Sequence, residues 1–123
     1  MHDVVEQLNV PLYSGLRLSE KNSFEIIKDL DPDLIVVSTY NQLIPQAIID
    51  LPKYGVVNFH PSLLPKYRGP TPTYSVLANG EFETGVTAHF IEGEQFDRGR
   101  IVLQKKTDIF PGETDGILRK RLA

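Results

Sequence analysis

Two short apolar runs with a single short helix between them restrict the fold of this chain most. Residues 34–37 form a continuous apolar run that is typical of a strand covered on both faces, and residues 55–59 predict the next strand. Between them, Pro45 suits the first turn of a helix that ends near Asp50. A helix that connects two strands of one sheet makes them parallel, because it returns the chain to the end of the sheet where the first strand began. The pattern therefore predicts an α/β fold with parallel strands.

The first thirty residues predict one more strand and one more helix. Residues 10–13 form a short apolar run before a turn, and we expect a third strand here, parallel to the other two. Residues 22–30 have apolar positions at helical spacing, and Asn22 followed by Glu25 resembles a capping box. We therefore expect an amphipathic helix that begins with this capping box.

The second half of the sequence predicts a change of sheet type. Residues 74–78 follow a proline-rich loop and predict a helix that ends at an Asn-Gly pair. Residues 85–91 and 100–109 predict two strands joined by a short polar turn, which is typical of an antiparallel pair. Thr114 then suits the cap of a last helix over residues 115–122. We expect a mixed sheet, in which parallel strands are followed by an antiparallel pair.

Length and composition narrow the class of protein. A chain of 123 residues suits one domain, so we expect residues 1–123 to belong to a single domain. The sequence has no cysteine, which excludes a thiol nucleophile, a disulfide and a thiolate metal site. The net charge of −3 argues against binding nucleic acid through general phosphate neutralisation. No apolar run is long enough to span a membrane, and we expect a soluble cytoplasmic protein whose oligomeric state is left open.

The strand over residues 55–59 leads into two polar side chains that suit catalysis. Asn58 and His60 are two positions apart, so an extended chain points them to the same face. The carboxyl ends of parallel strands are where open α/β sheets bind ligands. An amide beside an imidazole can stabilise an oxyanion and move a proton. The pattern alone equally allows Asn58 to cap a turn and His60 to be an ordinary hydrogen-bonded residue.

Two blocks of sequence resemble the signature of a known family. Residues 58–69, NFHPSLLPKYRG, form the first block, and the second runs from GVTAHF at 85–90 through FDRG at 96–99. Both resemble the formyltransferases that use 10-formyltetrahydrofolate, including those acting on glycinamide ribonucleotide, methionyl-tRNA and nucleotide sugars. The resemblance implies a Rossmann-like catalytic domain, of which this chain carries the middle and is incomplete at both ends.

The resemblance implies a catalytic set of Asn58, His60 and Asp97. A formyl group would pass from 10-formyltetrahydrofolate to a primary amine on a nucleotide sugar, an aminoacyl-tRNA or a ribonucleotide. Asn58 and a protonated His60 would donate to the oxyanion, and the Asp97 carboxylate would favour the charged imidazole. Ser62 is better interpreted as a turn residue than as a nucleophile, because no serine-elbow pattern surrounds it.

The resemblance also implies where the folate lies. Two loops would hold its pterin ring largely through backbone groups, and their residues are Tyr40, Asn41, Gln42, Leu43, Ile44, Ile91, Glu92, Gly93 and Phe96. No metal is expected, because His60, His89 and Asp97 offer no pair of ligands on one helix face. Two alternatives stay open: a hydrolase that releases formate to water, and a folate-binding fragment that catalyses nothing.

Other polar residues have less distinctive patterns. His89 alternates with Ala88 and Phe90, and we expect it to face solvent. Lys66 and Arg68 either reach a phosphate on the acceptor or are solvated. The basic run 119–121 is expected on the solvated side of the last helix.

Overall fold

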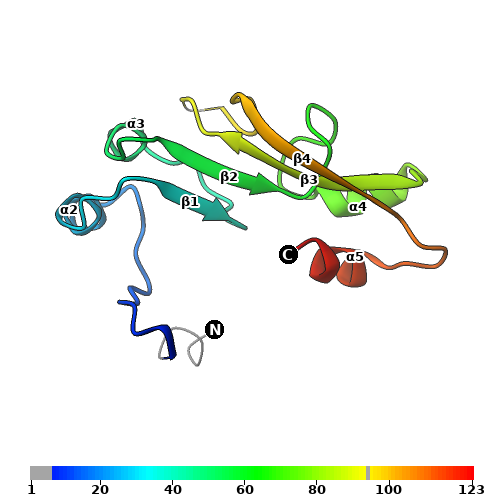
Figure 1. Ribbon diagram of the computed structural model, residues 1–123, viewed down its shortest axis with the longest axis horizontal. Helices are drawn as coiled ribbons and strands as arrows, with labels where there is room; N and C mark the ends of the chain where they lie inside the picture. Colours follow the sequence, from blue (N-terminus) through cyan, green and yellow to red (C-terminus); the bar gives the residue numbers. More distant parts are fainter. Residues whose placement is uncertain (1–6, 94) are drawn as a thin grey trace.

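A mixed sheet of four strands forms the centre of the computed structural model, which describes residues 7–93 and 95–123 (Figure 1). The strands are β1 (Ile35–Ser38), β2 (Val56–His60), β3 (Glu83–Phe90) and β4 (Ile101–Asp108), and they lie in the order β1-β2-β3-β4. β1 and β2 are parallel, whereas β2 with β3 and β3 with β4 are antiparallel. This arrangement confirms the predicted mixed sheet.

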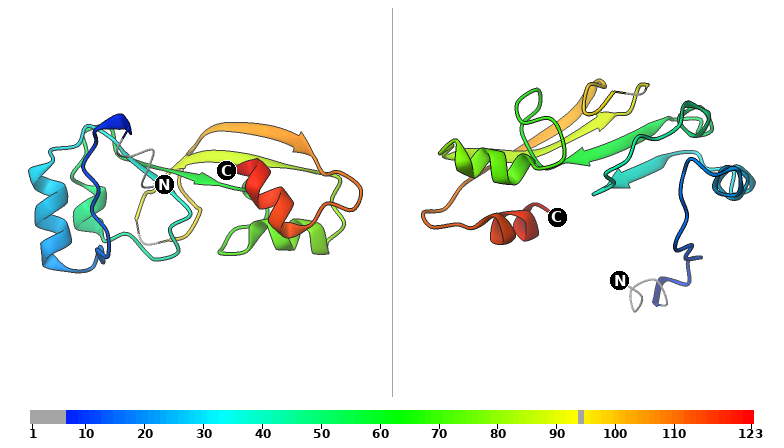
Figure 2. Two further views of the ribbon diagram at one scale, coloured as in Figure 1. Left: turned by 90° about the horizontal axis from the view of Figure 1, so that it is seen from below. Right: turned by 180° about the vertical axis from the view of Figure 1, so that it is seen from behind.

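Four short helices whose full bounds lie within the described residues flank the sheet. They are α2 (Lys21–Asp29), α3 (Gln46–Ile49), α4 (Pro72–Ala78) and α5 (Asp115–Leu122). Figure 2 shows α2 and α3 at one end of the sheet and α4 and α5 at the other, with the loop after β3 between them. Within the described residues, no helix has the length and apolar character needed to cross a membrane.

Two predictions about the first thirty residues are wrong. Residues 10–13 form no strand, and the expected three parallel strands are two among the described residues. Val10 and Tyr13 are about half exposed, so this segment lacks the covered environment that its apolar character suggested. The capping box is also absent, because α2 begins at Lys21 and its N-cap, Glu20, makes no side-chain hydrogen bond. Asn22 therefore lies inside the first turn, where it cannot cap the helix.

The packing of α3 against the parallel strands fixes the loop after β1. Ile48 and Ile49 of α3 are buried with Val56 of β2 and with Ile44, which precedes the helix. Because Ile44 is 5% exposed, the loop that carries it is tied to the core at its far end. The short crossover thus sets the course of the chain that leaves the carboxyl end of β1.

Helix α5 is fastened to the rest of the fold by a buried leucine and an arginine. Thr114 caps the helix as predicted, since its Oγ1 accepts a hydrogen bond from the N–H of Ile117. Leu118 is fully buried. Arg121 does not lie free on the solvated side as expected: it donates to Thr107 Oγ1 and to the carbonyl of Asp108 at the end of β4. Leu118 thus anchors the middle of α5, and Arg121 holds its last turn against the end of β4.

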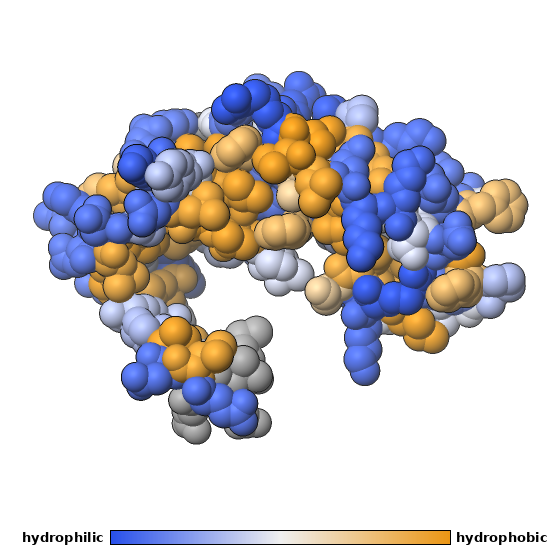
Figure 3. All heavy atoms as spheres, in the orientation of Figure 1, coloured by the Kyte–Doolittle hydropathy of each residue, from blue (hydrophilic) through white to orange (hydrophobic). Residues whose placement is uncertain are grey.

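One face of the sheet carries apolar side chains that remain accessible. The strand register aligns Phe59, Ala88 and Leu103 across β2, β3 and β4. Phe59 and Leu103 are 44% and 66% exposed. Figure 3 shows hydrophobic residues exposed across the middle of the molecule in one view. Asn58, His60 and His89 occupy alternate strand positions and so belong to the opposite face.

Candidate functional site

Neighbouring strands bring three polar side chains to one face of the sheet. Asn58 and His60 lie at the carboxyl end of β2, and His89 of β3 is the register partner of Asn58. Side chains of directly opposite residues in an antiparallel pair lie on the same face. The sheet therefore places His89 beside Asn58 and close to His60.

Asp97 completes this cluster from the turn after β3. Its Oδ1 lies 3.4 Å from Nδ1 of His60 and 3.4 Å from Nε2 of His89. The Nδ2 of Asn58 donates to the same oxygen at 3.4 Å. The other oxygen, Oδ2, accepts a hydrogen bond from the N–H of Gly69 at 2.9 Å. The structure thus brings together Asn58, His60 and Asp97, which sequence analysis had grouped.

The loop after β2 fixes the orientation of His60. The ring Nε2 donates to the carbonyl of Tyr67 at 2.8 Å, because a carbonyl oxygen can only accept. Nδ1 then faces the Asp97 carboxylate. Ser62 behaves as the expected turn residue, since its Oγ donates to the carbonyl of Lys66 at 2.8 Å. In its charged form, His60 therefore presents a donor to an acceptor at each nitrogen.

His89 was expected to face solvent, and that expectation is wrong. The side chain is 1% exposed, and its Nδ1 donates to the carbonyl of Phe90 at 2.9 Å. The neutral ring then has its lone pair at Nε2, which lies 3.2 Å from Nδ2 of Asn58 and accepts from it. Alternation with Ala88 and Phe90 was the correct signal, but it gives no indication of which face is covered. The face became clear only from the register with Asn58.

The electrostatic environment keeps the Asp97 carboxyl ionised. Burial raises its pKa, but its contacts with His89, Gly69 and His60 lower it more. The pKa of Asp97 therefore lies below its ordinary value. Because the side chain is 8% exposed, solvent screens these contacts little. The site thus holds a negative charge in contact with two imidazoles.

The lowered pKa predicts a pH-dependent contribution of Asp97 to stability. A depressed folded-state pKa stabilises the protein above the unfolded value of about 3.9, and this contribution is lost as pH falls through the folded value. We expect the difference in unfolding free energy between the wild type and Asp97→Asn to shrink as pH falls from 7 to below about 4. Chemical denaturation at a series of pH values measures it. A constant difference over that range would contradict the assigned charge.

A cavity of about 500 Å³ opens beside this cluster. Asn58, His60, His89 and Asp97 are among its lining residues. Eight of the nine residues expected to hold folate also line it: Tyr40, Asn41, Gln42, Leu43, Ile44, Ile91, Gly93 and Phe96. Glu92 is not among the lining residues and instead forms an ion pair with Arg100. The loop after β1 and the loop after β3 therefore form walls of one cavity.

A hydrogen bond links the loop after β2 to the turn that carries Asp97. Arg68 Nε donates to the carbonyl of Asp97 at 2.9 Å, so this arginine ties two loops together. Lys66 instead lies within 3.4 Å of Glu81, with a largely exposed side chain. Over the described stretches 7–93 and 95–123, no group of three or more His, Asp and Glu side chains suits a metal ion.

Gly99 allows the turn after β3 to approach its own strand. A Cβ added at this position would overlap the carbonyl oxygen of Phe90, the acceptor for His89. We expect Gly99→Ala to lower the unfolding free energy by about 2 kcal/mol, because the backbone must move. In contrast, a Cβ at Gly116 of α5 meets nothing within 4 Å. Gly116→Ala should therefore stabilise the protein by up to about 1 kcal/mol. Equal effects of both substitutions in urea denaturation would disprove the close approach.

Comparison with known proteins adds a family and several relatives. The model of the family described as formyl transferase matches residues 2–123. The methionyl-tRNA formyltransferase of Alkaliphilus oremlandii is 43% identical over 114 residues, covering 93% of this chain and 36% of that protein. That of Thermotoga maritima is 41% identical over 119 residues, covering 97% and 38%. The chain therefore spans slightly more than a third of the length of these curated relatives.

Solved structures share the fold over nearly all of the chain. The phosphoribosylglycinamide formyltransferase from Streptococcus pneumoniae TIGR4 has a TM-score of 0.82 at 20% identity, with 98% of this chain and 71% of that chain covered. The glycinamide ribonucleotide transformylase 1 from Geobacillus kaustophilus has a TM-score of 0.78 at 28% identity, with 98% and 68% covered. A sugar N-formyltransferase from Shewanella sp FDAARGOS_354 has a TM-score of 0.74 at 24% identity, with 97% and 45% covered. The predicted Rossmann-like fold is thereby confirmed.

Proposed function

Because the chain belongs to the formyl transferase family, we propose that it forms part of an enzyme that transfers a formyl group from 10-formyltetrahydrofolate to a primary amine. In this proposal, residues 1–123 are part of one catalytic domain. The observation that carries it is the contact of the Asp97 carboxylate with Asn58, His60 and His89 at the edge of a cavity. An acid, an imidazole and an amide in contact suit proton transfer and stabilisation of negative charge.

The cavity walls fit a flat heterocycle with a polar edge. Leu43, Ile44, Ile91 and Phe96 give the lining an apolar part. Within the part of the chain that the structure describes, the backbone N–H groups of residues 40–44 donate no hydrogen bond to the protein. A pterin ring stacked between the two loops would bury its faces and use such backbone groups at its edge. We therefore place 10-formyltetrahydrofolate between residues 40–44 and residues 91–96, and no metal is required.

The proposed chemistry assigns a distinct task to each polar residue. Bound folate supplies a formyl carbon that an amine can attack. Nε2 of His60 stays bonded to the carbonyl of Tyr67, and Nδ1, whose contact with Asp97 is long at 3.4 Å, turns its donor to the formyl oxygen. The contact of Asn58 with Asp97 is long at 3.4 Å, so the formyl oxygen can replace Asp97 as its acceptor. The Asp97 carboxylate takes the proton that the amine loses, because its lowered pKa keeps it ionised beforehand. The same proton then passes to N10 as the bond between N10 and the formyl carbon breaks, which releases tetrahydrofolate and the formylated amine.

The acceptor is proposed from the relatives' names. The relatives more than 40% identical are named methionyl-tRNA formyltransferases, which makes an aminoacyl-tRNA the first acceptor to test. The names of structural neighbours add a ribonucleotide and an amino sugar. All three carry an amine, and the cluster of Asp97 with His60 does not itself distinguish them.

The experiment is to follow tetrahydrofolate release from 10-formyltetrahydrofolate with and without each acceptor. Release that requires an amine is the expected result. Release of formate without any amine would instead indicate the hydrolase, and folate binding without release would indicate a fragment that only binds. Absence of both release and binding would refute the proposed function.

A further inference from the structure

Helices α4 and α5 line the same cavity as the loops proposed to hold folate. Arg119 of α5 lines this cavity together with Pro72 and Thr73 at the start of α4. In Figure 2 these two helices lie together, on the other side of the loop after β3 from α2 and α3. A cationic side chain therefore lies on the same cavity as Asn58, His60 and Asp97.

A buried threonine anchors this arginine through a carboxylate. Thr73 is 2% exposed, and its Oγ1 donates to Oδ1 of Asp115 at 2.6 Å. Oδ2 of Asp115 accepts from Nη2 of Arg119 at 2.7 Å. Both oxygens of the carboxylate are thus used inside the protein, one by a group that belongs to the core. The chain of contacts limits the positions that the Arg119 guanidinium can take.

Arg119 retains donors that can reach a ligand. A guanidinium carries five N–H donors in a planar fork that matches the oxygens of phosphate. Among the described residues, the hydrogen bond to Asp115 uses only Nη2 and leaves Nε and Nη1 without a protein acceptor. The side chain is 62% exposed, so an incoming anion has access to it. Both oxygens of the Asp115 carboxylate already accept a hydrogen bond from the protein.

We propose that Arg119 binds an anionic group of the phosphate class on the amine acceptor. This inference rests on the proposed function, because it assigns the two ends of the cavity to the two substrates. The Asp97 carboxylate attracts the amine end of such an acceptor, and Arg119 attracts its anion. An acceptor that carries both groups is thereby oriented with its amine toward the formyl group. Arg119 is then a specificity residue that acts on acceptor binding.

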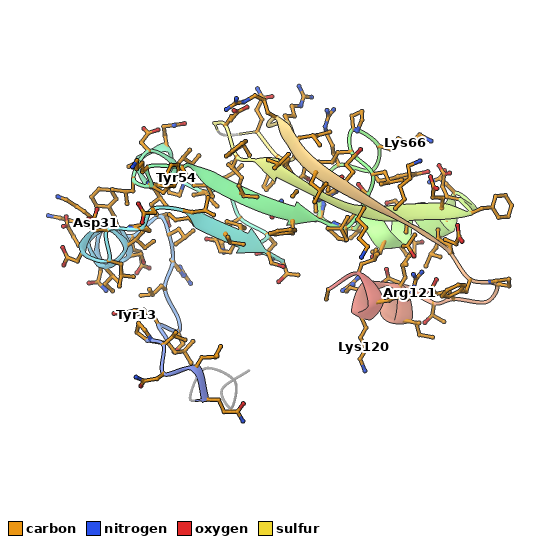
Figure 4. The ribbon with its side chains drawn as sticks, viewed as in Figure 1. Tyr13, Asp31, Tyr54, Lys66, Lys120 and Arg121 are labelled. Carbon is orange, nitrogen blue, oxygen red and sulfur yellow. The ribbon has the colours of Figure 1, made fainter. Side chains whose placement is uncertain are left out.

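The adjacent residue offers a matched control. Lys120 carries the same charge one position along α5, and it is not among the residues that line the cavity. Figure 4 shows its side chain pointing away from the rest of the molecule. Arg119→Gln and Lys120→Gln therefore change the net charge equally, but only Arg119→Gln removes the proposed contact with the anion. Arg119→Lys keeps the charge and loses the planar fork.

The test compares glucosamine 6-phosphate with glucosamine, which differ only in the phosphate. Calorimetry should show tighter binding of glucosamine 6-phosphate by the wild type. We expect Arg119→Gln to weaken that binding about tenfold, with partial recovery in Arg119→Lys and a change of less than about twofold in Lys120→Gln. Equal weakening by the two Gln variants, or a wild type that does not distinguish the two sugars, would overturn the inference.

Tetrahydrofolate release with the same two sugars separates this inference from the proposed function. Release whose preference for the phosphorylated sugar falls in Arg119→Gln but not in Lys120→Gln supports both. If release occurs but Arg119→Gln keeps the wild-type preference for the phosphorylated sugar, the role of Arg119 is overturned and the proposed function stands. Phosphate-dependent binding without release from any acceptor overturns the proposed function, and with it the assignment of Arg119 to an acceptor.

Discussion

Replacing Asp97 by Asn is expected to lower the turnover of 10-formyltetrahydrofolate by about 10³-fold. The carboxylate contacts Asn58, His60 and His89 together. The substitution removes the negative charge that faces both imidazoles. It also removes the carboxylate, which is the strongest hydrogen-bond acceptor among these four side chains. An amide oxygen cannot take the proton from the amine, and an uncharged amide holds the His60 ring less firmly than a carboxylate does.

The fold should survive this change. Asn has the same shape as Asp and can still accept the hydrogen bond from the N–H of Gly69, which now reaches Oδ2 of Asp97. Circular dichroism and folate affinity should therefore stay close to those of the wild type at pH 7. Asp29→Asn serves as the control, because Asp29 is exposed at the end of α2 and does not line the cavity. Turnover by Asp97→Asn equal to that of Asp29→Asn would remove Asp97 from the catalytic set.

The sheet could be predicted because its strands carry their own signals. The apolar runs of β1 and β2 and the short turn before β4 were sufficient to predict a parallel pair followed by an antiparallel pair. The run at residues 10–13 has a similar character, yet it forms no strand. A strand exists only when another strand accepts its hydrogen bonds, and this requirement cannot be seen in a four-residue pattern. The local sequence pattern therefore predicted where helices and strands occur better than it predicted which strands pair with each other.

The site was partly predictable for the same reason. Asn58 and His60 are two residues apart, so their common face follows from alternation alone. Asp97 is separated from them by nearly forty positions, and only the resemblance to a family linked it to the pair. The contact itself depends on the turn after β3, where Asp97 has φ +53° and Gly99 packs against Phe90. No property of Asp97 in the sequence indicates that geometry.

His89 shows the limit of alternation as a signal. Alternation assigned it to the face opposite Ala88 and Phe90, and the structure agrees. It could not indicate that this face is covered at β3 by the loop after β2, where the N–H of Leu64 donates to Oγ1 of Thr87. His89 itself contacts Asn58 of β2 and Asp97 of the turn after β3, so its burial depends on packing that alternation does not describe. The residue missed by sequence analysis is the one that holds Asn58.

His89→Phe is expected to lower kcat by about 10- to 100-fold with little change in the KM for 10-formyltetrahydrofolate. Phe fills the buried space but offers no acceptor for Nδ2 of Asn58, which His89 Nε2 now provides at 3.2 Å. Without it the Asn58 amide is free to rotate, and its donor is no longer aimed at the formyl oxygen. His89 is therefore a positioning residue, and its loss should affect the chemical step more than binding.

His89→Gln distinguishes positioning from simple packing. The Gln side chain can supply an amide oxygen to Asn58, so we expect it to recover a large part of kcat, whereas the Phe variant does not. Steady-state kinetics on both variants, with thermal unfolding to compare their stabilities, provides the measurement. Equal losses in the two variants would mean that the acceptor at this position is irrelevant. Wild-type kcat in His89→Phe would mean that His89 only fills space, and that the Asp97 contact alone orients Asn58.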